Sequence, residues 1–371
     1  MDNPIKVGIS HGDVNGVGYE VILKALAEEG ITDIFTPVIF GVPSIMEKAK
    51  QDLNISNLAV NRVEKVSDVK NGKINLVVLK GTPELHPGEV RKDAGASAVE
   101  SLERAVEALK NGEIDVLVTA PISKEAVQSD SFNFPGHTEF LSERIGEGED
   151  AMMILCNDSL RVALLTKHIP VTKIAENISQ EKIVEYVKRF ERILKRDFGV
   201  LRPTIAVLSL NPHAGDGGLL GSEEEEIIKP ALTTLVDEEG ILAFGPYPAD
   251  GFFGHANYKN FDGILAMYHD QGLAPFKTIA TNGGVNFSAG LPFVRTSPDH
   301  GTAFDIAWKN MADASSMRDA IYMAIDIFRR RKTFDEASSN PLKKYVHDRP
   351  ERGERHEKNQ FKDDLLEKVD D

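Results

Sequence analysis

The stretch that decides the fold is KVGISHGDVNGVG (residues 6–18), a short strand and a glycine-rich loop that lead into a helix. Residues 6–10 predict a strand, and residues 19–29 predict a helix with one apolar face. Glycines at such a junction let the backbone approach a ligand, and a helix start favours an anion. Gly12, Gly16 and Gly18 do not have the spacing of the dinucleotide fingerprint GxGxxG, so a plain tight turn is an equally good interpretation.

The same alternation of strands and helices continues along the chain. The run at 115–119 is almost wholly apolar, which is typical of a strand covered on both faces. The sequence therefore predicts an α/β fold with a largely parallel or mixed sheet. Further strands are expected at 37–41, 74–79, 151–155, 160–166, 204–209, 263–268 and 292–295, and further helices at 44–53, 94–110, 138–145, 179–196, 222–237, 302–310 and 315–331.

Composition limits the classes of protein and partner. The length of 371 residues predicts about two domains, and 41% hydrophobic residues exclude a disordered chain. With 58 acidic and 43 basic residues, the formal net charge is −15. This charge argues against a nucleic-acid partner or an anionic membrane surface, but a local basic pocket can still bind a small anion.

The expected compartment is the cytoplasm. Cys156 is the only cysteine, so no disulfide can form within the chain, and its apolar surroundings predict a buried, inert thiol. The first residues lack the pattern of a signal peptide, and no apolar run approaches the ~20 residues of a membrane span. Residues 347–371 are highly charged and predict a solvated tail, with room for a short helix at 365–369.

Two loops offer candidate binding groups at predicted helix starts. Lys124 would lie in the first turn of a helix, where a cation opposes the helix dipole, so it either holds an anion or is an ordinary solvated lysine. Thr138 is a candidate helix cap, whereas the neighbouring His137 has no capping role and is a candidate for substrate contact.

Three histidines, His168, His213 and His269, each stand at or just after a predicted apolar strand. If those strands are neighbours, three imidazoles converge and leave an open position on a divalent metal. Their spacing is far too long for a local metal signature, so on spacing alone three unrelated histidines remain the favoured interpretation.

The run 272–302 gives the strongest local signal, because it gathers Lys277, Asn286 and Arg295 among apolar strands. Lysine and arginine bind phosphate, and arginine adds a bidentate fork. The segment 299–303 is expected to open a helix as a further anion or nucleotide loop, although an ordinary surface loop is the alternative. By contrast, the acidic run 221–226 is interpreted as a capping box of Ser222 and Glu225.

Several strings, in this order, resemble one enzyme family. They are GHTEF (136–140), LNPHAG (210–215), MYHDQG (267–272), GLPFVRTS (290–297) and DHGTA (299–303). Over about residues 5–332 the chain resembles the 4-hydroxythreonine-4-phosphate dehydrogenase family of pyridoxal phosphate biosynthesis. The resemblance implies two α/β/α domains flanking a cleft, like isocitrate and isopropylmalate dehydrogenases, without a Rossmann dinucleotide motif. The lobes would be 1–135 with 300–345, and 136–299, followed by a charged tail at 346–371.

The resemblance also implies the cofactors, the assembly and the site residues. The family uses NAD and a divalent metal (Zn, Mg or Co) and works as a homodimer with the site near the interface. Matched by motif, the implied metal ligands are His168, His213 and His269; the substrate contacts are His137, Thr138, Lys277, Asn286 and Arg295; the catalytic group is Lys277, His137, Asp270 and Asp250; and the cofactor contacts are Asp13, Gly16, Gly18, His300, Gly301 and Thr302.

The implied reaction is the NAD- and metal-dependent oxidation and decarboxylation of 4-phosphooxy-L-threonine to 3-amino-2-oxopropyl phosphate. Two departures widen the choice of substrate. Val14 and Tyr19 replace two prolines of the family's first loop, and Ser123 replaces a histidine that precedes the matched lysine. The alternatives are a D-threonate or D-erythronate 4-phosphate dehydrogenase with the same framework, or a non-catalytic metabolite-binding sensor.

Overall fold

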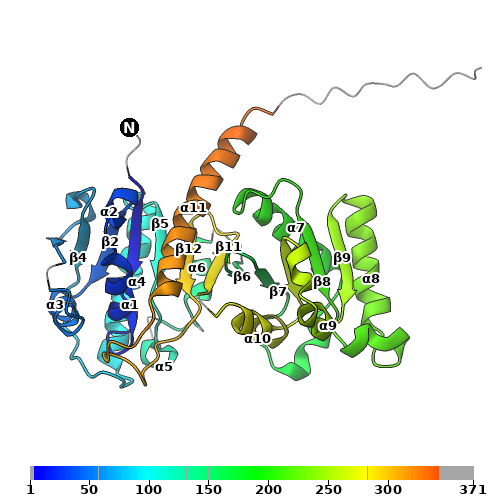
Figure 1. Ribbon diagram of the computed structural model, residues 1–371, viewed down its shortest axis with the longest axis horizontal. Coiled ribbons are helices and arrows are strands. Elements are labelled where there is room, and N and C mark those ends of the chain that lie inside the picture. The colour runs from blue at the N-terminus through cyan, green and yellow to red at the C-terminus, as the bar shows by residue number, and fades with distance from the viewer. Residues whose placement is uncertain are drawn as a thin grey trace, which may run out of the picture. The chain divides into compact units, whose positions relative to one another are not determined.

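The computed structural model describes residues 4–341 except 57, 130, 131, 135, 147, 149 and 282. Its strands form one sheet in the order β3-β4-β2-β1-β5-β12-β11-β6-β7-β10-β8-β9, and helices pack against it (Figure 1). The predicted α/β class is therefore confirmed. The strands are β1 Lys6–Ser10, β2 Thr36–Gly41, β3 Val60–Val63, β4 Ile74–Val78, β5 Val116–Thr119, β6 Met152–Cys156, β7 Arg161–Leu164, β8 Thr204–Leu208, β9 Leu242–Tyr247, β10 Gly263–Ala266, β11 Val285–Ala289 and β12 Val294–Pro298.

The sheet is mixed, and its antiparallel part is central. The pairs β12–β11, β11–β6 and β6–β7 are antiparallel, whereas every other described pair is parallel. In Figure 1 the blue and cyan strands β1, β2, β4 and β5 and the green strands β7 and β8 stand on either side of the yellow strands β11 and β12. The central strands of the sheet are buried, which explains the apolar runs in the sequence.

The helices follow the predicted positions closely for most of the chain. They are α1 Gly18–Leu26, α2 Ile31–Ile34, α3 Pro43–Asp52, α4 Lys92–Lys110, α5 Lys124–Val127, α6 His137–Ile145, α7 Gln180–Arg196, α8 Lys229–Thr233, α9 Ala249–Gly254, α10 His269–Ile279 and α11 Ser315–Ser338. Short π-helical turns at Glu224–Ile228 and Thr234–Glu238 flank α8, so the helix predicted at 222–237 exists in an irregular form.

The helix predicted at 302–310 is wrong. Ala303, Trp308 and Asn310 have left-handed backbone angles, with φ of 45°, 61° and 57°, which a right-handed helix does not contain. The indole Nε1 of Trp308 donates a hydrogen bond to the carbonyl oxygen of Val14 at 2.9 Å. Tertiary contacts with the first loop thus hold this segment as a series of turns, and the segment 299–303 opens no helix.

Helix α10 was missed because its sequence contains two poor helix formers, Gly272 and Pro275. The structure explains the glycine, since a Cβ built at Gly272 would lie 2.8 Å from Leu164 and 2.9 Å from Val162. This helix therefore packs closely on β7. Strands β3, β9 and β11 and helix α9 were also missed, and the strand predicted at 292–295 lies at Val294–Pro298.

Among the described residues, those up to Phe334 form one compact unit, and Asp335 to Pro341 belong to a separate one. The finer division into two lobes at 135/136 and 299/300 stays a prediction. The tail at 346–371 and its short helix lie outside the described residues. In the part of the chain that the structure describes, no helix is long and apolar enough to cross a membrane. Cys156 is buried, as predicted, and burial raises the pKa of its thiol to about 12.

Candidate functional site

A cavity of about 240 Å³ lies over one face of the central strands β12, β11 and β6. Side chains alternate between the two faces of a strand, so Arg295 and Ser297 share this face, and Asn286 on β11 pairs directly with Ser297. The start of α6, helix α10 and the segment from Asp299 to Gly301 enclose the cavity. All five residues predicted to contact substrate line it, namely His137, Thr138, Lys277, Asn286 and Arg295.

Arg295 is the deepest cation of this cavity. The residue is 2% exposed, and its guanidinium donates hydrogen bonds to the hydroxyls of Thr119 (3.2 Å from Nε) and Ser288 (2.8 Å from Nη1). No carboxylate among the described residues forms an ion pair with it. Burial lowers the pKa of Arg295 to about 9. A buried cation held only by neutral hydroxyls leaves a positive potential in the cavity, which an anionic ligand would neutralise.

His137 and Asn286 add polar atoms that lack partners. The Nε2 atom of His137 and the Oδ1 atom of Asn286 are both buried and make no hydrogen bond within the described chain. Burial, and secondarily the charge of Arg295, hold the pKa of His137 well below its ordinary value. The imidazole is therefore neutral at pH 7 and can accept or donate a proton.

The mouth of the cavity carries a second cation. Lys277 on α10 is exposed, and its Nζ donates to the backbone oxygen of Asp299 at 3.1 Å. Lys124 also lines the cavity, and the preceding Ser123 caps α5 by accepting a hydrogen bond from the backbone N–H of Ala126. The cavity lining thus combines the cations Lys124, Lys277 and Arg295 with the carboxylates of Glu139 and Asp299, and the excess of positive charge suits a small anionic molecule.

His168 and His269 lie side by side, with ring centroids 5.9 Å apart. The Nδ1 of His168 is 3.7 Å from Oε1 of Glu139, and the Nδ1 of His269 is 2.6 Å from Oδ1 of Asp270. The His168 ring lowers the pKa of Glu139. Histidines that bind metals commonly have a carboxylate on the other ring nitrogen, so the donor chemistry of this pair fits a divalent metal. Glu139 is not among the site residues predicted from the sequence.

Among the described residues of one chain, His213 is not grouped with His168 and His269. In the described part of the chain, no three histidine, cysteine, aspartate or glutamate side chains are grouped so as to hold a metal ion. His213 begins a left-handed run with φ values of 53° to 80° through Gly215. Asp250 lies in the first turn of α9 and forms no described hydrogen bond or ion pair with His168 or His269.

Glu224 holds the loop that carries His213. It is fully buried, and its Oε1 accepts hydrogen bonds from the backbone N–H groups of Leu210 (2.8 Å) and Asn211 (2.7 Å). The capping box of Ser222 and Glu225 is wrong, because no side chain caps this helix start. In the sequence, Glu224 is indistinguishable from the glutamates beside it.

The N-terminal glycine loop is closely packed. Asp13, Gly16 and Gly18 are buried, and a Cβ built at Gly16 or Gly18 would lie 2.8 Å from the carbonyl oxygen of Thr302 or 2.2 Å from that of His11. These glycines are therefore required by close packing of the backbone. Among the predicted cofactor contacts, His300 and Gly301 line the cavity, whereas Asp13, Gly16, Gly18 and Thr302 lie outside its lining.

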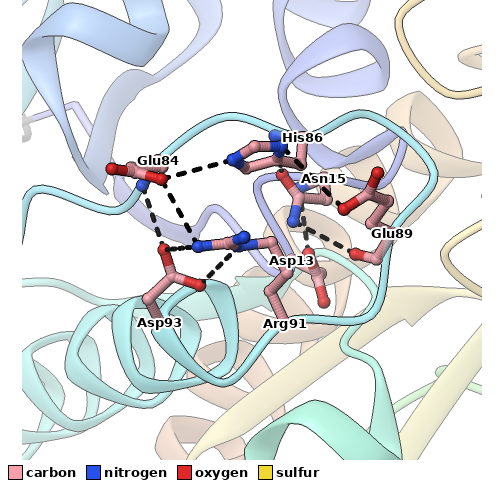
Figure 2. A network of polar contacts seen from close by, with 7 residues as sticks. All are labelled: Asp13, Asn15, Glu84, His86, Glu89, Arg91 and Asp93. Atoms are coloured by element: carbon pink, nitrogen blue, oxygen red, sulfur yellow. Dashed lines mark hydrogen bonds and ion pairs between the residues drawn. The ribbon is translucent and has the colours of Figure 1, made fainter.

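A network of polar contacts fastens a second loop onto this one, as Figure 2 shows. The Asn15 side chain accepts a hydrogen bond from the backbone N–H of His86 (2.8 Å) and donates one to the carbonyl oxygen of Glu89 (3.1 Å). Arg91 pairs with Asp93, with 3.0 Å between Nε and Oδ1. This network was not predicted from the sequence, since Asn15 lies more than 70 positions before His86 and Glu89.

The fold and cavity define an α/β protein with a cavity in its central sheet region that contains a buried arginine. Comparison with known proteins gives the family. The sequence model of the family described as pyridoxal phosphate biosynthetic protein PdxA matches residues 33–324, and the chain belongs to this family.

This chain aligns with several similar proteins over nearly the whole length of each of them. A 4-hydroxythreonine-4-phosphate dehydrogenase of Bacteroides thetaiotaomicron is 51% identical over 94% of this chain and 95% of its own. A D-threonate 4-phosphate dehydrogenase of Salmonella typhimurium is 37% identical over 86% of this chain and 98% of its own. The solved structure of a 4-hydroxythreonine-4-phosphate dehydrogenase from Klebsiella pneumoniae has a TM-score of 0.74 and 36% identity, and covers 88% of this chain and 98% of its own. The family resemblance found in the sequence is thus confirmed.

Proposed function

We propose that this chain is an NAD-dependent and metal-dependent 4-hydroxythreonine-4-phosphate dehydrogenase, which oxidises and decarboxylates 4-phosphooxy-L-threonine to 3-amino-2-oxopropyl phosphate. The observation that carries the proposal is Arg295, a buried cation without a carboxylate partner, on the floor of a cavity with a cationic mouth. The names of two similar relatives, at 51% and 42% identity, support this choice of reaction.

Each cavity residue has a role in this proposal. Arg295, Asn286 and Thr138 orient the polar ends of the substrate, and Arg295 takes one of its anionic groups. The neutral imidazole of His137 and the ammonium of Lys277 move protons during oxidation and decarboxylation. Asp270 positions the His269 ring through Nδ1, and we place Asp250 in the catalytic group by its sequence motif alone.

The cofactors belong to the proposal as well. His300 and Gly301, at the edge of the cavity, would contact NAD, while Asp13, Gly16, Gly18 and Thr302 fix the loops beneath. When bound, NAD supplies a hydride acceptor, and the divalent metal (Zn, Mg or Co) supplies a Lewis acid that acidifies the substrate hydroxyl. A reducing, cytoplasmic location accords with the single, buried cysteine.

We further propose that His168 and His269 of one chain hold the metal together with His213 of a second chain in a homodimer. The support is that the first two histidines are adjacent, whereas the described residues of one chain supply no third ligand. Mixed dimers of His168→Ala and His213→Ala test this. An equal mixture restores about one quarter of wild-type activity and metal content if the site is shared, because half of the dimers then carry one intact site. No restoration would show that all three ligands come from one chain.

The alternative substrates are D-threonate 4-phosphate and D-erythronate 4-phosphate, and the Salmonella relative favours the first of them. NADH formation, followed by absorbance with each of the three phosphates, separates these possibilities. The proposal predicts the highest kcat/KM with 4-phosphooxy-L-threonine. A higher value with another phosphate would change the substrate, and binding without NADH formation would indicate a non-catalytic sensor.

A further inference from the structure

A second, larger cavity of about 550 Å³ shares no lining residue with the functional site. It lies at the start of β7, where Arg161 is the first residue, whereas His168 follows the end of that strand. It also touches the end of α10 at Ile279, whereas His269 begins that helix. Two elements thus lead from this cavity to the histidine pair. Its volume is within the usual range of roughly 300–1,000 Å³ for small-molecule sites.

Two arginines form the cationic part of this cavity. The Arg161 guanidinium is held with its Cζ 4.8 Å from the centroid of the Phe198 ring, and its Nη1 donates to the backbone oxygen of Asp262 at 3.3 Å. Its Nε is buried and has no hydrogen-bond partner among the described residues. Burial lowers the pKa of Arg161, and the charge of Arg330 adds to this shift, whereas the charges of Asp262 and Asp158 oppose it. No ion pair to either arginine is found among the described residues.

Aspartates form the acidic part. Asp158 lies in the turn between β6 and β7, and Asp319 and Asp326 lie on α11. The Asp319 carboxylate lies close to Gly283, and a Cβ built at this glycine would be 2.2 Å from Oδ2 of Asp319. Burial, followed by the charge of Asp158, raises the pKa of Asp319. None of the three aspartates forms an ion pair within the described chain.

We propose that this cavity is a second ligand site, which takes a small zwitterion with one anionic group and one ammonium group. Five charged side chains of both signs line one cavity, yet none of them pairs with another. A ligand anion at Arg161 and Arg330 and a ligand ammonium at the aspartates would satisfy both groups at once. Phe198 and Tyr322 offer apolar contact to the carbon skeleton. This site is independent of the proposed dehydrogenase activity.

The test uses O-phosphoethanolamine as the zwitterionic probe, with inorganic phosphate and ethanolamine as its separate halves, and measures binding by isothermal titration calorimetry. Full-length chain is expected to bind the zwitterion at least about tenfold more tightly than either half. Arg330→Gln and Asp326→Asn, both exposed on α11, should each weaken binding by about tenfold or more. The matched control Lys332→Gln removes an exposed charge from the same helix outside the cavity lining and should leave binding unchanged.

A further variant separates this cavity from the functional site, which also attracts anions. Binding of the zwitterion should survive Arg295→Met, because Arg295 lines only the other cavity. Equal affinity for the zwitterion and its halves would overturn the proposal. So would binding that is lost with Arg295→Met but unchanged by Arg330→Gln and Asp326→Asn.

Discussion

Two buried arginines in this molecule have opposite surroundings. Arg331 on α11 is 6% exposed and makes two hydrogen bonds to the Asp197 carboxylate, at 2.7 Å from Nε and 2.8 Å from Nη2. Arg295 is 2% exposed and contacts only hydroxyls. Arg331 ties α11 to the end of α7, and its charge is compensated within the chain. Arg295 has no carboxylate in hydrogen-bond contact among the described residues, and only the more distant charge of Glu139 opposes the effect of its burial beside the cavity.

The difference shows which buried charges serve structure and which serve binding. Uncompensated burial of a cation is costly, so an arginine in that state marks a place where a ligand completes the site. The glycine loop is the opposite case, because it resembles a binding loop in composition but is packed within the chain. It has the composition of an anion-binding loop, but neighbouring backbone atoms occupy the space beside its glycines. Its Asn15 side chain forms hydrogen bonds with the 84–93 loop.

The largest effect is expected from Arg295→Met, which removes the anion partner of the substrate but preserves much of the side-chain volume. We expect kcat/KM to fall by about 10³-fold or more, since a buried charge pair with the substrate is lost. The free energy of unfolding without substrate should not fall, because the buried charge is relieved. Steady-state kinetics and thermal unfolding of the same preparation measure both quantities. A marked loss of stability would show that Arg295 is a structural residue.

The matched substitution Arg331→Met should give the opposite result. It leaves the buried Asp197 carboxylate without its partner, so the free energy of unfolding should fall by about 3–5 kcal/mol. The substrate KM of the folded fraction should be unchanged, because Arg331 does not line the functional cavity. Urea unfolding followed by circular dichroism measures the loss. Unchanged stability would remove the distinction between the two arginines.

The buried His11 predicts a pH dependence of stability. Burial lowers its pKa to about 4, and it stacks on Tyr19 with ring centroids 5.2 Å apart. In the unfolded chain the imidazole has its ordinary pKa near 6.5, so the unfolded state gains a proton first as the pH falls. Stability due to neutral His11 is therefore full above pH 6.5 and is lost between pH 6.5 and 4, by roughly 3 kcal/mol.

The variant His11→Gln isolates this contribution, because His137 also has a lowered pKa and adds its own pH dependence. Urea unfolding at pH 7 and pH 4.5 should show a smaller difference in the variant than in the wild-type chain. The same difference in both proteins would mean that His11 does not titrate differently on folding.

The smallest effect concerns the glycine loop. Gly12 has a φ of 72°, and a Cβ built there would lie 2.3 Å from the carbonyl oxygen of Pro121. Gly12→Ala should lower the free energy of unfolding by about 2–3 kcal/mol, whereas Gly72→Ala, with a similar φ of 68° and open space around it, should cost about 1 kcal/mol. Chemical denaturation compares them. Equal losses would mean that backbone conformation, and not packing, requires the glycine.

The sequence predicts much of the fold, because the buried strands and the amphipathic helices have recognisable hydrophobic patterns. Strand β1 lies at residues 6–10, as expected, and α7 differs from the predicted range by one residue. Helix α10 could not be found in this way, since Gly272 and Pro275 hide a helix that close packing on β7 stabilises. The turns at 302–310 depend on Trp308 and its bond to a residue nearly 300 positions earlier.

The candidate site also has features that the sequence predicts and features that it does not. Asn286 and Arg295 share one face of the sheet, and His137 begins α6 beside them. Their chemistry is visible in the sequence, and the structure brings all three to one cavity. The sequence cannot show that Thr119 and Ser288, rather than a carboxylate, hold Arg295. Nor can it show that Glu224 is the one buried member of an acidic run, because both facts depend on which distant backbone lies nearby.

The most direct test of the central claim is a crystal structure of the chain with 4-phosphooxy-L-threonine bound. We expect an anionic group of the substrate in the cavity of β12, β11 and β6, with its oxygens about 2.7–2.9 Å from the Arg295 guanidinium. Substrate bound elsewhere, with the Arg295 side chain still held only by Thr119 and Ser288, would contradict it.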